Sequence, residues 1–204
     1  MDVIIYEEEK KAEILSQALV VLMSGGTVVY PTETAYALGA DFYSPHAYRA
    51  VFEIKFRTPG KFLPVIVPDL NYARTLVRFT PYAYELATRY WPGPLTLVLP
   101  FLYHREWPHH PDPYLALRVS SHAFAANLAR AFGRPLVSTS ANISGKALCY
   151  NAAGVIEQLK RSKKRPDLII DAGSLPEVEP STIVKIDDKM TNVIRKGPIK
   201  LPKK

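Results

Sequence analysis

Short apolar runs of strand length alternate along this chain with stretches whose apolar residues recur at helical spacing, and this alternation limits the possible folds most. The strand candidates are Ile4-Ile5, TVVYPT at 27–32, LPVIVP at 63–68, LTLVLP at 95–100, LALRVS at 115–120, PLVSTSA at 135–141, DLIIDA at 167–172 and STIVKI at 181–186. The pattern predicts an α/β protein with many strands. Several candidates follow one another without an intervening helix, so we expect a mixed sheet rather than an all-parallel one.

Helices are expected where apolar residues return every three or four positions. The first contains Ile14, Leu15, Ala18, Leu19 and Leu22 and should stop at Gly25-Gly26. Further helix candidates are 45–55, 81–91, 121–132 and 152–160. The sequence contains no repeat, low-complexity tract or convincing linker, which favours a single domain over 1–204 with a short basic tail from about 196.

Composition excludes several classes of protein. With 204 residues, 48% hydrophobic and 22% charged, the chain resembles an ordinary globular protein. No apolar run approaches the roughly 18 residues of a membrane span, and the acidic start MDVIIYEEEKK is unlike a signal peptide, so we expect a cytoplasmic protein without membrane contact. A single cysteine, Cys149, excludes an intramolecular disulfide and a cysteine zinc cluster. The net charge of +7 favours polyanions such as nucleotides or RNA.

The segment IKFRTPGKFLPV at 54–65 places three cations beside an apolar run. Lys55, Arg57 and Lys61 fall within seven residues. They either decorate a solvated turn or hold an anionic ligand.

Polar side chains also follow two of the predicted strands. In YPTETAYALGAD, the residues Thr32, Glu33, Thr34 and Tyr36 precede Gly39, at the kind of strand exit where open α/β sheets bind ligands. In PLVSTSANISG, the strand continues into short hydrogen-bonding side chains that suit phosphate or ribose contacts, namely Ser138, Thr139, Ser140 and Asn142. Capped turns are the alternative interpretation of both runs.

Arg118 lies inside the apolar strand LALRVS. Burying an unpaired guanidinium is costly, so Arg118 must meet an anion, either a ligand or a carboxylate of the core.

Taken together, these segments resemble a known family. The run TVVYPTETAYALGAD, the triplet KFR, WPGPLTLVLP, LALRVS, STSANISG, and PSTIVKI followed by VIRKG occur in the order seen in YrdC-like threonylcarbamoyl-AMP synthases, over nearly the whole chain. The resemblance implies a twisted, largely open mixed sheet with flanking helices and a concave basic cavity. It also implies that L-threonine, bicarbonate and ATP, with Mg²⁺, react to give threonylcarbamoyl-AMP and pyrophosphate. The product serves N6-threonylcarbamoyladenosine modification of tRNA, which other proteins complete, so tRNA and those proteins are further expected partners.

The implied chemistry assigns roles to the candidate residues. A carbamate oxygen attacks the α-phosphate of ATP, and concentrated positive charge is needed where the anions meet. Lys55 and Arg57 are the expected catalytic cations, and Mg²⁺ would share the charge. By similarity to the family, ATP would contact Arg57, Lys61, Ser138, Ser140, Asn142 and Arg195. Threonine would contact Thr32, Thr34, Tyr36, Arg118 and Ser181, and no protein-bound metal site is expected.

The chain departs from the family pattern at three places. Relatives commonly read glycine where this chain has Ala37 and Phe56, and proline where it has Lys196. A side chain at position 37 or 56 would forbid a glycine-only backbone conformation or crowd a ligand. The larger two-domain relatives also carry a C-terminal extension after a linker, and we expect this protein to be the single-domain form.

Two other functions remain open. A non-enzymatic RNA-binding module would also use a basic concave face, although no recognised RNA-binding signature is present. A carbamoyl-adenylate module occurs in hydrogenase maturation proteins, but within longer chains with zinc-binding cysteines.

SGK at 144–146 lacks the spacing of a phosphate-binding P-loop. His104, His109 and His110 stand in a proline-rich segment where solvated loop histidines are the commoner case.

Overall fold

The computed structural model describes residues 1–58, 62–107, 109–110 and 112–202. The helices are α1 (Lys11–Met23), α2 (Pro45–Lys55), α3 (Leu70–Leu76), α4 (Pro81–Tyr90), α5 (Ala123–Phe132) and α6 (Ala152–Leu159), with short 3-10 helices η1 (Glu8–Lys10) and η2 (His104–Glu106). The strands are β1 (Asp2–Ile5), β2 (Thr27–Pro31), β3 (Tyr36–Asp41), β4 (Val65–Ile66), β5 (Leu95–Pro100), β6 (Tyr114–Arg118), β7 (Leu136–Ser140), β8 (Leu168–Asp171), β9 (Thr182–Ile186) and β10 (Thr191–Arg195).

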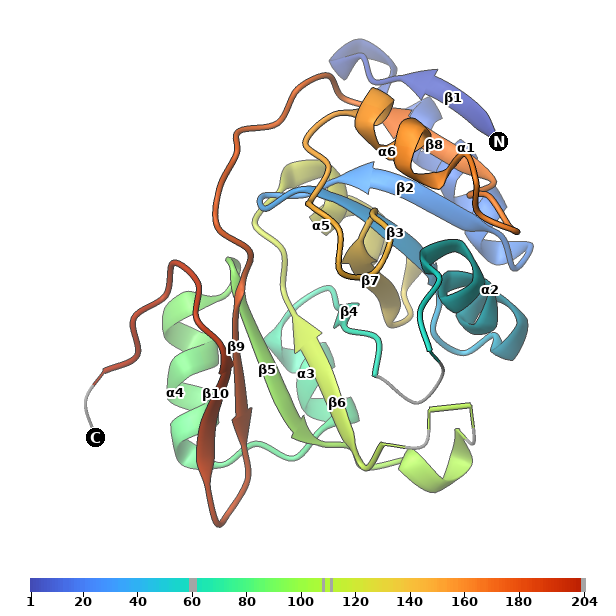
Figure 1. Ribbon diagram of the computed structural model, residues 1–204. Coiled ribbons are helices and arrows are strands. Elements are labelled where there is room, and N and C mark those ends of the chain that lie inside the picture. Colours follow the sequence, from blue (N-terminus) through green and yellow to red (C-terminus); the bar gives the residue numbers. More distant parts are fainter. Residues whose placement is uncertain (59–61, 108, 111, 203–204) are drawn as a thin grey trace.

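In this part of the chain the strands form one ten-stranded sheet in the order β1-β8-β2-β3-β7-β4-β6-β5-β9-β10 (Figure 1). Four neighbouring pairs are parallel, namely β1–β8, β2–β8, β4–β6 and β5–β9, and the other five are antiparallel. The predicted mixed, open α/β sheet is therefore confirmed. The sequence analysis did not anticipate β3, α3 or β10.

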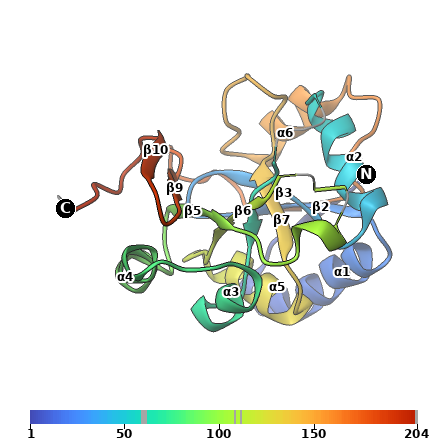
Figure 2. The same cartoon turned by 90° about the horizontal axis from the view of Figure 1, so that it is seen from below.

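The helices cover the two faces of the sheet unequally. Figure 2 shows α1, α5, α3 and α4 along one face, while α2 and α6 cover the opposite face over one half of the sheet. In β5, Leu95, Leu97 and Leu99 belong to the core that includes the buried residues of α4. Because side chains alternate along a strand, Thr96 points to the opposite face. Among the described residues, no α-helix covers that face over β5, β6, β9 and β10 (Figure 2), and the candidate site opens there.

Local capping explains why helix starts could be located from sequence. Ser44, Thr80 and Asn151 each accept a hydrogen bond from a backbone N–H three residues ahead. Pro45 and Pro81 take the first helical positions, where no N–H is needed. The structure therefore begins α2 and α4 at the predicted residues.

The segment after β10 packs on the fold up to residue 202. The hydroxyl of Tyr90 donates to the carbonyl of Lys200 at 3.2 Å, and the N–H of Ile199 donates to the hydroxyl of Thr182 at 3.0 Å. The predicted basic tail is thus tied to α4 and β9. No helix within the described ranges is long and apolar enough to cross a membrane.

Candidate active site

A cavity of about 250 Å³ opens on the helix-free part of the sheet. Its lining brings together nine of the predicted site residues, Thr32, Thr34, Tyr36, Arg57, Arg118, Ser138, Ser140, Ser181 and Arg195. Lys55 and Asn142 are not part of this lining. Lys61 lies outside the described residues. Residues from six separate stretches of sequence thus meet at one place.

Thr32 and Thr34 lie in the turn that joins β2 to β3. The Thr32 hydroxyl donates to the carbonyl of Ala35 at 2.7 Å and accepts from the N–H of Thr34 at 3.2 Å. The two threonine hydroxyls lie 3.2 Å apart. The capped-turn interpretation therefore holds for Thr32, while Thr34 keeps hydrogen-bonding capacity for a ligand in the cavity it lines.

Tyr36 has a structural partner for its hydroxyl. The hydroxyl donates to the carbonyl of Gly173 and accepts from the N–H of Ala172, both at 2.8 Å. Burial is the main cause that raises the pKa of Tyr36 to about 12. This side chain joins β3 to the loop after β8, so its contribution to the cavity is a wall rather than a free hydroxyl.

Arg118 forms an ion pair with a carboxylate that the sequence placed in the same polar run as the threonines. Its Nη1 atom lies 3.0 Å from Oε1 of Glu33, and their side chains are 8% and 14% exposed. The structure thus supports the core-carboxylate interpretation of Arg118, and the residue also lines the cavity.

Arg195 reaches the cavity from the edge strand β10. Its Nε and Nη2 atoms donate to the carbonyl and hydroxyl oxygens of Ser181, both at 2.9 Å. The Ser181 hydroxyl lies 2.9 Å from that of Thr96. Burial, and then the charge of Arg118, lower the pKa of Arg195. Two guanidinium groups therefore influence each other within one site.

A register shift determines which face of the sheet Arg195 occupies. Val193 pairs with Val184, but Arg195 pairs with Ile183, so Ile194 is an extra residue in β10. Ile183 lines the cavity, and paired residues share a face of the sheet. Without this register shift, Arg195 would pair with Thr182 and point to the opposite face.

Close packing next to β10 explains a glycine of the VIRKG motif. A Cβ atom on Gly197 would lie 2.2 Å from the carbonyl oxygen of Pro180. The backbone can run beside residues 180–182, and so support Ser181, because position 197 has no side chain. Lys196, one of the departures from the family pattern, is exposed.

Lys55 is buried beneath the loop that follows β7. Its side chain is almost inaccessible, with the residue 2% exposed, and its ammonium donates to the carbonyls of Ser140 and Asn142 and to Oδ1 of Asn142. The Ser140 hydroxyl also donates to Oδ1 of Asn142, and Nδ2 of Asn142 donates to the carbonyl of Lys146. Burial, followed by the charge of Arg57, lowers the pKa of Lys55 to about 7. Lys55 and Asn142 together fix the shape of loop 140–146.

Arg57 faces the cavity directly after a strained residue. Phe56 has a φ of 48°, the left-handed conformation that favours glycine, and this is one of the three departures from the family pattern. Nη2 of Arg57 donates to the carbonyl of Phe62 at 3.1 Å, and burial lowers the pKa of the guanidinium. Ala37, by contrast, lies in β3 opposite Tyr30, where a side chain is accommodated.

A buried polar atom at this site has no hydrogen-bond partner among the described residues. This atom is Nε of Arg57, which lines the cavity. Buried polar groups are nearly always paired in folded proteins, so unpaired ones at a cavity indicate a place for ligand or water.

Sequence reasoning missed part of the lining. The additional residues include Phe62, Pro64, Thr96, Leu148, Pro180 and Ile183. Thr96 could have been found, because it is the one polar side chain in the strand LTLVLP. The apolar residues carry no comparable signal.

Two of the three loop histidines, His109 and His110, have structural partners, and the expectation of a solvated loop histidine was wrong for His110. His110 is fully buried, with its ring nitrogens 3.0 Å from the Tyr48 hydroxyl and the Tyr114 carbonyl. Nε2 of His109 lies 2.9 Å from the carbonyl of Phe42. Within the described ranges, no three His, Cys, Asp or Glu residues gather where they could hold a metal ion.

Comparisons with known proteins agree with this geometry. The family model described as "Sua5_yciO_yrdC: Telomere recombination" matches residues 20–197. A threonylcarbamoyl-AMP synthase of Marinobacter nauticus is 33% identical over 84% of this chain and 90% of its own. E. coli YciO has a TM-score of 0.80 at 25% identity, with 96% of this chain and 94% of YciO covered.

A further solved structure is that of P. abyssi Sua5 complexed with L-threonine. It has a TM-score of 0.82 at 31% identity over 96% of this chain. This chain spans 57% of the length of that protein. Since the family model covers residues 20–197 and the relative from Marinobacter nauticus is 33% identical over 84% of this chain, the chain belongs to the Sua5/YciO/YrdC family.

Proposed function

We propose that this protein is a threonylcarbamoyl-AMP synthase, a nucleotidyltransferase that forms threonylcarbamoyl-AMP and pyrophosphate from L-threonine, bicarbonate and ATP. The observation that carries the proposal is the meeting of Arg57, Arg118 and Arg195 on one cavity. The described lining contains no carboxylate. A site with this charge suits a substrate pair whose reacting groups, a carboxylate-bearing carbamate and a triphosphate, are both anionic.

The threonine end of the cavity would be formed by the turn after β2 together with β6. Arg118 would hold the substrate carboxylate, and Thr34 would offer its hydroxyl. Ser181 already contacts Arg195, so it would lie where the amino acid and the nucleotide meet. The substrate amine takes up bicarbonate with loss of water, and the resulting carbamate remains beside the guanidinium.

The nucleotide end would be formed by Arg57, Ser138, Ser140 and Arg195. A carbamate oxygen forms a bond to the α-phosphorus while the bond between that phosphorus and the bridging oxygen breaks, so pyrophosphate leaves with the electron pair. Arg57 would stabilise the charge that develops on the phosphate oxygens. Lys55 and Asn142 would act on the nucleotide through the shape of loop 140–146.

Mg²⁺ is proposed to accompany ATP rather than to occupy a protein site. Carboxylates are the usual protein ligands of Mg²⁺, and the described lining offers none. The residues do not fit a resident metal, and the reaction steps above use the protein's own cations.

The product is proposed to supply the threonylcarbamoyl group for N6-threonylcarbamoyladenosine in tRNA, with other proteins making the transfer. This role follows the names of the relatives, and the basic charge of the chain is compatible with contact to tRNA.

One assay distinguishes the synthase from the alternatives. The protein is incubated with ATP, Mg²⁺, bicarbonate and L-threonine, and pyrophosphate and the adenylate product are measured with and without threonine. Threonine-dependent release of both supports the synthase. Replacing threonine with carbamoyl phosphate tests the carbamoyl-adenylate module, and the absence of any pyrophosphate together with tight RNA binding would favour the RNA-binding module.

A further inference from the structure

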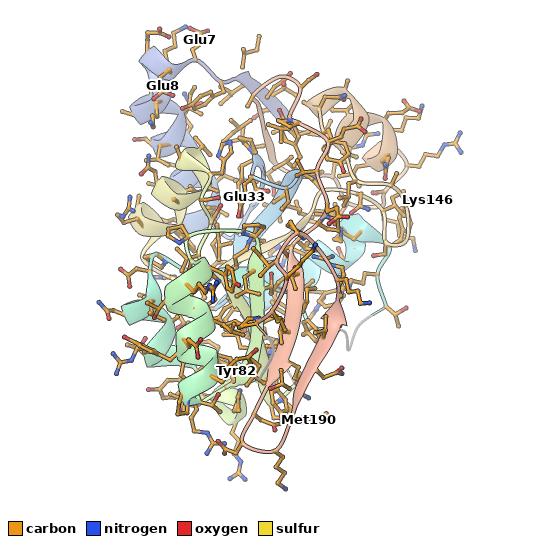
Figure 3. The ribbon with its side chains drawn as sticks, turned by 90° about the vertical axis from the view of Figure 1, so that its left-hand side faces the viewer. Glu7, Glu8, Glu33, Tyr82, Lys146 and Met190 are labelled. Carbon is orange, nitrogen blue, oxygen red and sulfur yellow. The ribbon has the colours of Figure 1, made fainter. Side chains whose placement is uncertain are left out.

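Glu33 stands out because it is a partly buried carboxylate beside a strongly cationic site. Its side chain is 14% exposed, and it is not part of the cavity lining although Thr32 and Thr34 on either side are. Figure 3 labels Glu33 in the middle of the molecule. It therefore contacts Arg118 from outside the cavity.

Glu33 is itself held by a short chain of hydrogen bonds. The Ser120 hydroxyl donates to Oε2 of Glu33 at 2.5 Å, and the N–H of His122 donates to the Ser120 hydroxyl at 3.3 Å. Ser120 is 2% exposed and follows β6, which carries Arg118. The carboxylate is thus oriented by the segment that continues from the strand of its partner.

The ion pair leaves hydrogen-bonding capacity unused. Nη1 of Arg118 and Oε1 of Glu33 lie 3.0 Å apart, yet neither atom has an aligned hydrogen bond in the structure. A guanidinium has five N–H groups in a rigid plane, so a single contact at Nη1 orients the plane and leaves the other groups for a ligand.

The charges around Arg118 also indicate that Glu33 holds the Arg118 guanidinium in place. Burial first, and then the charge of Arg118, lower the pKa of Arg195, so the two guanidinium groups repel each other. An uncompensated guanidinium at 8% exposure would turn away from its neighbour toward water. Glu33 supplies the opposite charge from outside the cavity, where it does not repel anionic substrates directly.

We propose that Glu33 is a positioning residue of the threonine end, which holds the Arg118 guanidinium in place for the substrate carboxylate and is in turn oriented by Ser120. This inference rests on the proposed function and assigns a role to a residue outside the lining of the cavity.

The test is steady-state kinetics of pyrophosphate release by Glu33→Gln, with L-threonine and ATP varied separately. The expected result is a KM for threonine raised at least about tenfold, with the KM for ATP and kcat within about threefold of wild type. Glu157→Gln, which neutralises an exposed carboxylate of α6, is the matched control and should change neither KM.

Two further variants keep the test decisive if Glu33→Gln folds poorly. Ser120→Ala retains the charge but removes the orienting hydroxyl, and Glu33→Asp retains the charge on a shorter side chain. Both variants should raise the KM for threonine, although by less than Glu33→Gln does. In each of them, the KM for ATP should change by a smaller factor than the KM for threonine. If the KM values for threonine and ATP both rise in parallel with a loss of thermal stability, the ion pair between Arg118 and Glu33 is merely structural. That result would overturn the proposal. A fall in kcat at unchanged threonine KM would also overturn it, because Glu33 would then act on the reacting groups.

Failure of the proposed function is distinguishable from failure of this inference. A wild-type protein without threonine-dependent pyrophosphate would refute the synthase. Calorimetric titration of wild type and Glu33→Gln with L-threonine would still decide the role of Glu33, because equal affinities, or no binding to either, would overturn it.

Discussion

The ammonium nitrogen of Lys55 lies 2.9 Å from the backbone oxygen of Asn142 and 3.0 Å from its side-chain oxygen. The two residues are 87 positions apart, and together they join the end of α2 to the loop after β7. Lys55 therefore contacts the protein backbone where a purely catalytic cation would contact a phosphate. Its charge remains close to Arg57, as the effect of Arg57 on its pKa shows.

Lys55 should make stability depend on pH. Its pKa is lowered from 10.5 to about 7, so above pH 7 the unfolded chain binds more protons than the folded protein. Stability should then increase with pH across this window, by about 1–2 kcal/mol between pH 7 and pH 9. Urea unfolding at pH 7, 8 and 9 measures this, and Lys55→Met should show a smaller increase. The same slope in both proteins would contradict the lowered pKa.

Arg57→Ala should leave the protein folded yet lower synthase turnover at least about tenfold, because one preorganised cation is removed from a developing phosphate charge. Arg57→Lys should recover part of the activity, since an ammonium cannot hold two oxygens in one plane. Thermal stability and threonine-dependent pyrophosphate release are measured for both variants. Wild-type turnover in Arg57→Ala would refute its catalytic role.

Deletion of Ile194 should leave Arg195 at the cavity. The deletion removes the extra residue of β10, so Arg195 would follow Val193 directly and still pair with Ile183, while the rest of the sheet is retained because β10 is an edge strand. The KM for ATP should stay within about threefold of wild type, whereas Arg195→Ala should raise it at least about tenfold, as expected for the loss of a charge-assisted contact. Ile194→Ala keeps the residue count and should behave like wild type. Equal rises in the KM for ATP in the deletion and in Arg195→Ala would show that pairing with Ile183 is not what places Arg195 at the cavity.

Phe56→Gly should stabilise the protein. Phe56 is the C-cap of α2 at a φ of 48°, and the residue is 50% exposed, so it combines left-handed strain with little burial. A glycine there should raise the free energy of unfolding by about 1 kcal/mol. Phe56→Ala is the control, because it removes the ring but keeps the Cβ that causes the strain. Equal stabilities for the glycine and alanine variants would rule out this explanation.

Local sequence signals were sufficient for most of the secondary structure. The helix α2 and the strand β5 begin and end at the predicted residues, because Ser44 and Pro45 mark one helix start and the apolar run of β5 is bounded by prolines at 94 and 100. The strand β3 was missed because its small residues, around Gly39, lack a β-branched pattern. The order of motifs also sufficed to predict the family and most of the polar residues of the cavity.

Only the tertiary structure decided which partners the charged side chains have. Sequence alone left Arg118 between a ligand and a core carboxylate, and Glu33 was found beside it because β6 and the turn after β2 meet in space. The face occupied by Arg195 depended on one extra residue in β10. Such outcomes follow from strand register and from contacts between distant segments, which change with a shift of a single residue, whereas helix caps and apolar periodicity act within a few residues of the chain.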